Sequence, residues 1–409
     1  MSWFRDLSTV EKRTFYSAFG GWALDALDFM VFTFVISTLI TLWNIDKGSA
    51  GMLSTVTLLF SSLGGWAAGI LADRYGRVLM LQISILWFTS CTVLIGFTQN
   101  FEQLFILRAL QGIGFGGEWA VGSVLIGEMV RAEHRGKAVG IVQSGWAVGW
   151  GAAALLYTLA FSVLPENLAW RSLFWIGVVP ALLVLYIRRY VPEPEVFQQT
   201  RERRLQGEAR VSFWHIFSPR LLRTTLLASL LCMGVQGGYY AITTWLPAYL
   251  KLEKGLSVVG TGGYLLVVIL GSFCGYVCGA YLSDRLGRRP NFILFALLSM
   301  VSVYCYTQLP LTNTQMLLLG FPLGFTASGI FSGMGAFLTE LFPSEVRATG
   351  QGFSYNFGRA IGALFPSLVG FLSAKTSLGT AICLFAGGAY CAVLLVTYLL
   401  PETKGKQLV

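Results

Sequence analysis

The chain carries the same charged turn twice. Asp73-Arg74-Tyr75-Gly76-Arg77 recurs 211 positions later as Asp284-Arg285-Leu286-Gly287-Arg288, and each copy directly follows an apolar stretch long enough to cross a bilayer. A charged turn repeated at one offset after a membrane-length segment indicates two copies of one membrane unit. Many secondary transporters build a site between two such copies. We therefore expect a membrane transporter.

The composition also favours a membrane protein. Apolar residues make up 55% of the 409 residues and charged residues only 12%, whereas a soluble chain of this length needs more polar surface. The formal net charge is +9, but the basic residues are scattered through short loops and form no single solvated face. We therefore expect the lipid bilayer, and no nucleic acid, as a partner.

Twelve apolar segments predict an all-α integral membrane protein with 12 transmembrane helices. Each segment is close to the ~20 residues that span the hydrocarbon of a bilayer. The segments are 15–43, 50–72, 78–97, 102–130, 137–163, 172–190, 222–250, 257–282, 290–309, 314–341, 349–373 and 378–400. We expect two pseudo-symmetric six-helix bundles, residues 1–190 and 222–409, joined by a cytoplasmic linker, 191–221.

The basic residues also predict the orientation. If the N terminus is inside, the loops and tails on that side hold 22 of the 29 Lys and Arg residues. The opposite side holds five, which are Lys47, Arg171, Lys251, Lys254 and Lys375. By the positive-inside rule both termini are cytoplasmic. We expect a monomeric, multi-pass protein of the plasma membrane, the inner membrane in a bacterium.

Two further markers repeat at nearly the same offset as the turn. Glu128 and Arg135 match Glu340 and Arg347, and Pro192-Glu193 matches Pro401-Glu402. Carboxylates and guanidinium groups at the ends of neighbouring helices can pair and hold one face shut. The alternative role is anchoring by positive charge around a tight glycine turn. The predicted gating residues are Asp73, Arg74, Arg77, Glu128, Arg135, Asp284, Arg285, Arg288, Glu340 and Arg347.

These motifs resemble the major facilitator superfamily. The stretch from Gly69 to Arg77 is similar to its loop 2–3 signature, and Arg108-x-x-x-Gly112 is similar to its pattern in segment four. Three further stretches resemble the proton-coupled carboxylate symporters, which include lactate, sialic acid and aromatic acid permeases. They are Leu24–Phe29, Gly112–Trp119 and Tyr355–Arg359. The resemblance implies proton-coupled uptake of a small organic anion by alternating access.

The resemblance leaves alternatives open. Bacterial sialic acid permeases typically carry two extra central spans, so the short linker favours a smaller carboxylate. Pro401–Gly405 resembles the tail of sugar porters, which keeps a sugar or polyol symporter as an alternative, although Val235–Tyr240 lacks their paired glutamines and asparagine. A non-transporting membrane sensor on the same fold is the other alternative.

Buried carboxyl groups are the candidates for proton coupling. Asp25 and Asp28 fall near the centre of segment one, three residues apart and on neighbouring helix faces, and Glu118 falls near the middle of segment four. A charge at mid-bilayer costs at least ~2.5 kcal/mol, so each needs a partner or a proton. Two anions this close repel, which favours reversible protonation. The alternatives are a permanent charge pair for the aspartates and a helix-to-helix hydrogen bond for Glu118.

Two arginines lie inside predicted spans. Arg359 falls mid-span in segment eleven, where a guanidinium group can bind a carboxylate through two hydrogen bonds, or can pair with a carboxylate of the opposite half. Arg108 lies ~15 Å outward of Glu118 along one helix, so its expected partner is Asp28 or the substrate. The other predicted substrate-binding residues are Gln143, Trp146, Gln236, Tyr239, Tyr240, Tyr355 and Asn356.

The sequence offers no basis for enzyme chemistry. The two histidines, His134 and His215, fall in predicted cytoplasmic loops, and the seven cysteines fall in apolar segments without metal-ligand spacing. A phosphate-binding loop of the Walker type is also missing. We therefore expect neither an enzyme nor an ATP-driven pump, and no cofactor or metal.

Overall fold

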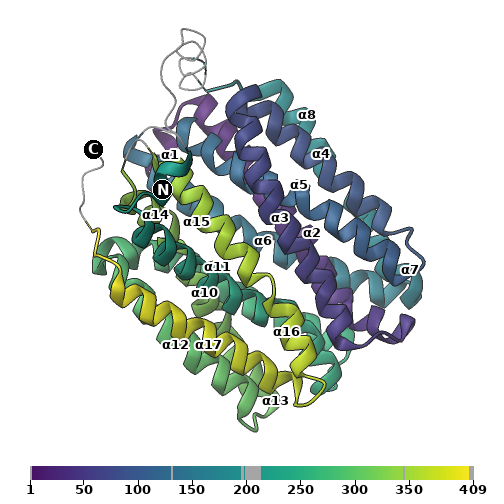
Figure 1. Ribbon diagram of the computed structural model, residues 1–409. Coiled ribbons are helices and arrows are strands. Elements are labelled where there is room, and N and C mark those ends of the chain that lie inside the picture. Colours follow the sequence, from purple (N-terminus) through teal and green to yellow (C-terminus); the bar gives the residue numbers. More distant parts are fainter. Residues whose placement is uncertain (1, 130–131, 195–197, 199–212, 344–345, 405–409) are drawn as a thin grey trace.

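The computed structural model describes residues 2–129, 132–194, 198, 213–343 and 346–404. The described residues form helices and connecting turns, with no strand among them. Figure 1 shows the helices of the N-terminal and C-terminal halves of the chain as two groups that lie side by side. The expected all-α fold is thereby confirmed.

The N-terminal half contributes eight helices within the described residues. They are α1 (Ser2–Arg5), α2 (Thr9–Trp43), α3 (Lys47–Tyr75), α4 (Arg77–Ile95), α5 (Phe101–Met129), α6 (Ala132–Val163), α7 (Glu166–Ile176) and α8 (Pro180–Tyr190). Side chains next to the helices define where several of them begin. Ser8 and Glu11 form a capping box at the start of α2, and Asp46 accepts the backbone N–H of Ser49 at the start of α3.

The C-terminal half repeats the pattern with more interruptions. Its elements are η1 (Phe213–Phe217), α10 (Leu222–Ala248), η2 (Tyr249–Glu253), α11 (Val258–Leu286), α12 (Arg288–Gln308), α13 (Asn313–Gly329), η3 (Ile330–Gly333), α14 (Met334–Leu341), α15 (Arg347–Gly362), α16 (Phe365–Leu372) and α17 (Leu378–Leu399). Of the predicted linker, 191–221, residues 195–197 and 199–212 lie outside the described part of the chain.

Ten candidate membrane spans are found among the described residues, so the number twelve stays a prediction. The predicted segment 349–373 is two helices, α15 and α16, instead of one. Pro366 at the start of α16 has no N–H group to continue the hydrogen bonding of α15, which explains the interruption. The predicted segment 102–130 is the single helix α5, 29 residues long.

The repeated turns have the same backbone geometry. Gly76 has φ +122° and Gly287 has φ +110°, a region that favours glycine. Glu193 accepts the backbone N–H groups of Arg77 and Val78 at 2.8 and 2.9 Å, at the first residues of α4. The Pro-Glu markers therefore belong to the turns, because the helix start attracts a carboxylate.

The C-terminal copy has the same arrangement. Glu402 accepts the N–H groups of Arg288 and Arg289 at 2.9 and 3.0 Å, at the first residues of α12. We call the end of the molecule that carries Gly76 and Gly287 the turn end, and the opposite end the far end.

Among the predicted gating residues, Arg288 and Glu340 form an ion pair at 2.9 Å between α12 and α14. Thr403 donates to Glu340 at 2.5 Å, so the pair joins elements of the C-terminal half. Arg77 donates to the carbonyl of Ala72 at 2.8 Å, and the carbonyl of Arg285 accepts from Lys404. The side chains of Asp73, Arg74, Glu128, Arg135, Asp284 and Arg347 lie outside the described part of the structure.

The two halves are joined at the far end. Ser367 of α16 donates to Thr55 of α3 with an Oγ–Oγ1 distance of 2.8 Å. Lys251 lies 3.7 Å from Glu166 and also donates to Thr38 at 3.4 Å, so it links η2 to α7 and α2. Contacts of this kind hold the far end closed.

Candidate functional site

Within the predicted spans, five carboxyl and guanidinium side chains of the described residues are buried in the interior of the helix bundle. Asp25 and Asp28 lie on α2, Arg108 and Glu118 on α5, and Arg359 on α15, with exposed fractions between 0% and 5%. Buried charges require partners, so their contacts define the candidate site.

Arg359 is held by the C-terminal half. Its Nε donates to Gln236 at 3.3 Å and its Nη2 donates to the hydroxyl of Tyr355 at 3.3 Å. Gln236 is itself fixed, because its amide donates to the carbonyl of Tyr355 at 3.0 Å. The Nη1 group of Arg359 is buried and has no hydrogen-bond partner among the described residues. An unsatisfied buried N–H group of an arginine favours an anionic ligand.

Aromatic rings from both halves surround this guanidinium group. Its carbon lies 5.5 Å from the ring centre of Phe115, 5.6 Å from that of Trp119 and 5.0 Å from that of Tyr355. Trp119 and Tyr355 are stacked with their centres 4.0 Å apart and an interplanar angle of 11°. Cation–π contacts of this kind stabilise the charge of Arg359, whose Nη1 has no hydrogen-bond partner in the described part of the chain.

A second contact between the halves lies beside this group. Trp146 of α6 donates to the hydroxyl of Tyr239 of α10 at 2.6 Å. Tyr240 donates to the side chain of Gln236 at 3.4 Å and thereby adds to the shell of Arg359. The structure thus brings together six of the predicted substrate-binding residues, namely Arg359, Gln236, Tyr239, Tyr240, Tyr355 and Trp146.

The carboxyl groups of Asp25 and Glu118 lie within hydrogen-bond reach of each other, across α2 and α5. Both oxygens of Asp25 are buried and have no other hydrogen-bond partner among the described residues. Gly21 makes this approach possible, because a side chain there would meet Glu118. Two carboxylates in contact repel when both are ionised, so the contact is stable when they share a proton.

Asp28 faces a different group. The amide of Gln111 donates to Asp28 at 2.5 Å and to Thr92 at 2.7 Å, and its oxygen accepts from Arg108 at 2.6 Å. The guanidinium carbon of Arg108 lies 4.0 Å from the ring centre of Phe32. Asp28 was an expected partner of Arg108, and the structure connects the two indirectly, through Gln111. All these side chains belong to the N-terminal half.

The other two predicted substrate-binding residues, Asn356 and Gln143, form no described hydrogen bond to the groups around Arg359 and Asp25. Asn356 donates to the carbonyl of Gly352 within its own helix at 3.0 Å, and its Oδ1 is buried close to Gly65 of α3. Gln143 is half-buried on α6, three residues before Trp146. No group of three or more His, Cys, Asp or Glu side chains in the described chain could hold a metal ion.

Several residues of these clusters were not predicted from the sequence. Gln111 follows Arg108 by three residues, a helical spacing that would have placed both on one face. Phe115 and Trp119 lie within Gly112–Trp119, one of the stretches that resemble the carboxylate symporters, but neither was predicted to have a role. Tyr276 of α11 lies within hydrogen-bond reach of Tyr239, and no sequence signal distinguishes it from a packing residue.

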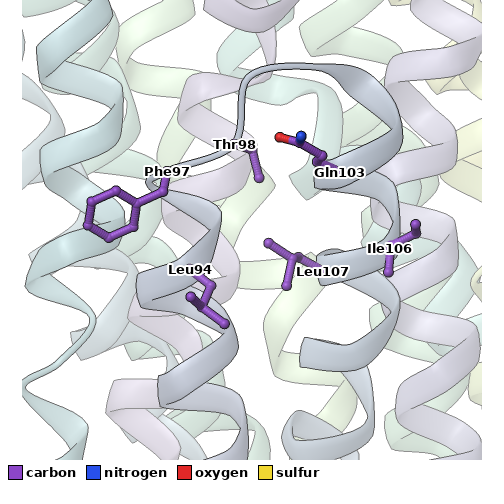
Figure 2. Close-up of a pocket in the computed structure, with 6 residues that line it drawn as sticks. All are labelled: Leu94, Phe97, Thr98, Gln103, Ile106 and Leu107. Atoms are coloured by element: carbon purple, nitrogen blue, oxygen red, sulfur yellow. The ribbon is translucent and has the colours of Figure 1, made fainter.

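A separate pocket lies at the far end between α4 and α5. Its lining residues are Leu94, Phe97, Thr98, Gln103, Ile106 and Leu107 (Figure 2). Leu94, Phe97 and Ile106 are more than half exposed on the outside of the bundle, and none of the buried charges lines this pocket. It is not part of the candidate site.

Comparisons with known proteins place this arrangement in context. Residues 18–280 and 266–408 match a family model described as Major Facilitator Superfamily. The chain is 44% identical to a probable 4-methylmuconolactone transporter of Cupriavidus pinatubonensis, over 99% of this chain and 94% of the relative. It is 31% identical to the cis,cis-muconate transport protein of Acinetobacter baylyi, over 94% of this chain and 93% of the relative.

A solved structure is similar in fold. The structure of a proton:xylose symporter bound to 6-bromo-6-deoxy-D-glucose has a TM-score of 0.76 with 21% sequence identity, over 98% of each chain.

Proposed function

This chain belongs to the Major Facilitator Superfamily and is a membrane transporter, not an enzyme, and from that premise we propose that it takes up a small organic anion together with protons. One observation carries the proposal. The buried Nη1 of Arg359 has no hydrogen-bond partner among the residues that the structure describes, and Arg359 lies in electrostatic range of Asp25, which contacts Glu118. An anion site and a proton site therefore face each other across the two halves of the chain.

Arg359 is the anchor of the substrate carboxylate in this proposal. Gln236 and Tyr355 hold two of its nitrogens, which orients the guanidinium group before the substrate arrives. A carboxylate that bonds to Nη1 completes the hydrogen bonding of the guanidinium group. The names of the relatives, transporters of muconate and methylmuconolactone, support a small organic acid as the cargo.

The pair formed by Asp25 and Glu118 is the proton carrier. The positive charge of Arg359 favours an ionised Asp25, and a bound substrate anion cancels that charge. Anion binding thus strengthens proton binding, and by linkage a bound proton strengthens anion binding by the same factor. The fully loaded site carries fewer uncompensated charges than a site with one ligand, so it is the form that reorients.

In the proposed mechanism the two halves of the chain give alternating access to the site. We place the turn end in the cytoplasm, because the loops and tails expected there hold 22 of the 29 basic residues, and we place the protein in the plasma membrane. The contacts of Ser367 and Lys251 then close the outer side. Two six-helix bundles, residues 1–190 and 222–409, would rock about Arg359 and the carboxyl pair.

The sugar porter alternative loses its main support. The tail Pro401–Gly405 suggested it, but Glu402 in that tail accepts the first N–H groups of α12. A tail motif that caps a helix carries no information about the substrate.

Uptake into proteoliposomes tests the proposal. Purified protein is reconstituted, an inward proton gradient is imposed, and accumulation of radiolabelled cis,cis-muconate or benzoate is compared with that of xylose. We expect accumulation of an acid with acidification of the lumen, and loss of both in Arg359→Gln. Arg223→Gln, at an exposed arginine, is the matched control. Accumulation of xylose but of neither acid would refute the proposal.

A further inference from the structure

The stacked rings of Trp119 and Tyr355 come from opposite halves of the chain. Trp119 lies on α5 and Tyr355 on α15, with ring centres 4.0 Å apart and planes 11° from parallel. If the two halves separate at the turn end, this stack must open. It is therefore a contact whose state depends on the position of the halves.

The stack lies between Arg359 and the turn end. α15 runs from the turn end towards the far end, and Tyr355 precedes Arg359 by four residues, or one helical turn of ~6 Å. The contacts of Ser367 with Thr55 and of Lys251 with Glu166 lie at the far end instead. A ligand bound to Arg359 thus has the ring pair on one side and the closed far end on the other.

The same two rings connect the anion site to the proton site. The hydroxyl of Tyr355 accepts a hydrogen bond from Arg359 at 3.3 Å. Trp119 directly follows Glu118, whose carboxyl group contacts Asp25. Binding of the anion at Arg359 therefore acts on a residue that is bonded to Tyr355. Binding of a proton at Glu118 acts on the residue next to Trp119.

We propose that Trp119 and Tyr355 form a two-ring gate that recognises planar conjugated carboxylates. Without substrate, the rings stack on each other and close the route from Arg359 to the turn end. A planar acid bound at Arg359 lays its π face against one of these rings, and so replaces the stacking that is lost when the gate opens. A saturated acid of the same size has no π face and cannot replace it. This inference depends on the proposed role of Arg359 as the anion anchor.

Benzoate and cyclohexanecarboxylate are a matched pair of probes, because both have seven carbons and one carboxylate but only benzoate is flat. Their Kd values are measured by calorimetry on the full-length protein in detergent. We expect wild-type protein to bind benzoate about tenfold tighter. Trp119→Leu and Tyr355→Leu should bring the ratio of the two Kd values close to one. Trp119→Phe should keep most of the preference, because a ring remains.

Two control variants distinguish loss of an aromatic ring of the gate from loss of the Tyr355 hydroxyl and from loss of a ring elsewhere. Tyr355→Phe removes the hydroxyl that accepts from Arg359 but keeps the ring, so both probes should weaken while their ratio stays. Trp87→Leu removes a ring that is 46% exposed on the outside of α4, and it should leave both Kd values unchanged. Melting temperatures in detergent identify any variant that fails to fold, and such a variant is replaced by Trp119→Met or Tyr355→Met.

The gate also predicts a leak. Trp119→Leu proteoliposomes should admit protons faster than wild type without substrate, as measured with a pH-sensitive dye in the lumen. An unchanged Kd ratio in folded Trp119→Leu and Tyr355→Leu proteins, or an unchanged proton leak, would overturn the gate. If wild-type protein binds neither acid, the proposed function fails. If it binds both acids equally and Arg359→Gln binds both about 10- to 100-fold more weakly, only the gate fails.

Discussion

The carboxyl groups of Asp25 and Glu118, 93 residues apart in the sequence, contact each other in the interior of the helix bundle. The contact joins α2 to α5 within the N-terminal half, and it faces Arg359 in the C-terminal half. Since two adjacent carboxylates repel when both are ionised, this contact is the natural place for a transported proton.

Neutralising either acid should uncouple transport. In Asp25→Asn and Glu118→Gln proteins the site no longer needs to bind and release a proton. We expect accumulation driven by a proton gradient to fall to the level of protein-free liposomes, while exchange of internal for external substrate persists. The measurement is lumen acidification with a pH-sensitive dye during uptake. Asp46→Asn, at a helix start on the surface, should behave as wild type.

Removing the guanidinium group of Arg359 should weaken anion binding. A hydrogen bond to a charged group contributes about 1.5–3 kcal/mol, so Arg359→Gln should raise the Kd for benzoate by about 10- to 100-fold. Arg359→Lys keeps the charge but not the fixed geometry, and it should lose less. Calorimetry in detergent gives both values. An unchanged Kd in Arg359→Gln would show that the anion binds elsewhere.

The cluster of Asp28, Gln111 and Arg108 should act as a stabilising unit of the N-terminal half. Asp28→Asn leaves the buried charge of Arg108 uncompensated, which we expect to cost about 3–5 kcal/mol of unfolding free energy. Arg108→Gln in the same chain should recover part of that loss. Denaturant unfolding of the two single variants and the double variant measures the coupling. Strictly additive effects would contradict a shared cluster.

Glu402 should contribute to stability in a pH-dependent way. Burial opposes ionisation, but the backbone N–H groups of Arg288, Lys404, Arg289 and Thr403 outweigh it and hold the pKa of Glu402 below its usual value. A lowered folded-state pKa gives stability that is present above the unfolded value of about 4.3 and is lost as pH falls through the folded value. Glu402→Gln should therefore reduce the loss of melting temperature between about pH 5 and pH 3. An identical profile for both proteins would contradict this role.

The glycines of the repeated turns should not accept a side chain. Gly76→Ala places a Cβ at φ +122° and against the carboxylate of Glu193, and Gly287→Ala does the same at φ +110° against Glu402. Each should cost about 1–2 kcal/mol or more, measured as a lower melting temperature in detergent. Gly69→Ala is the matched control on α3, since it has an ordinary φ and open space around it. Equal effects at Gly69 and Gly76 would contradict the explanation.

The repeat and its broken symmetry were visible in the sequence. At the offset of the turns, Asp25 corresponds to Gln236, and the structure places these two residues in different roles. Gln236 accepts from Arg359, while Asp25 contacts Glu118. The sequence therefore indicated positions that form the candidate site, because charged residues inside apolar segments stand out in composition alone.

The pairings among those positions needed the structure. Asp25 and Asp28 are three residues apart, and the charge of Asp28 acts on Asp25 as expected, but Asp28 bonds to Gln111 and Asp25 contacts Glu118. Asp25 and Asp28 differ by only about 60° of rotation about the axis of α2. Gln111 and Glu118 lie seven residues apart on α5, so the packing of α2 against α5 decides which of these two residues each aspartate meets.

The sequence by itself determined the helical fold, the glycine turns, the membership in a transporter family and the placement of charged residues inside apolar segments. These properties depend on residues that are close together in the sequence and on composition, and both can be read from the sequence. Only the tertiary structure decided that Trp119 stacks on Tyr355, that Gln111 bridges Asp28 and Arg108, and that the far end is closed. Each of these contacts either joins residues far apart in the chain or depends on which neighbour a side chain turns towards. Side-chain packing between helices determines both the partner and the side-chain direction.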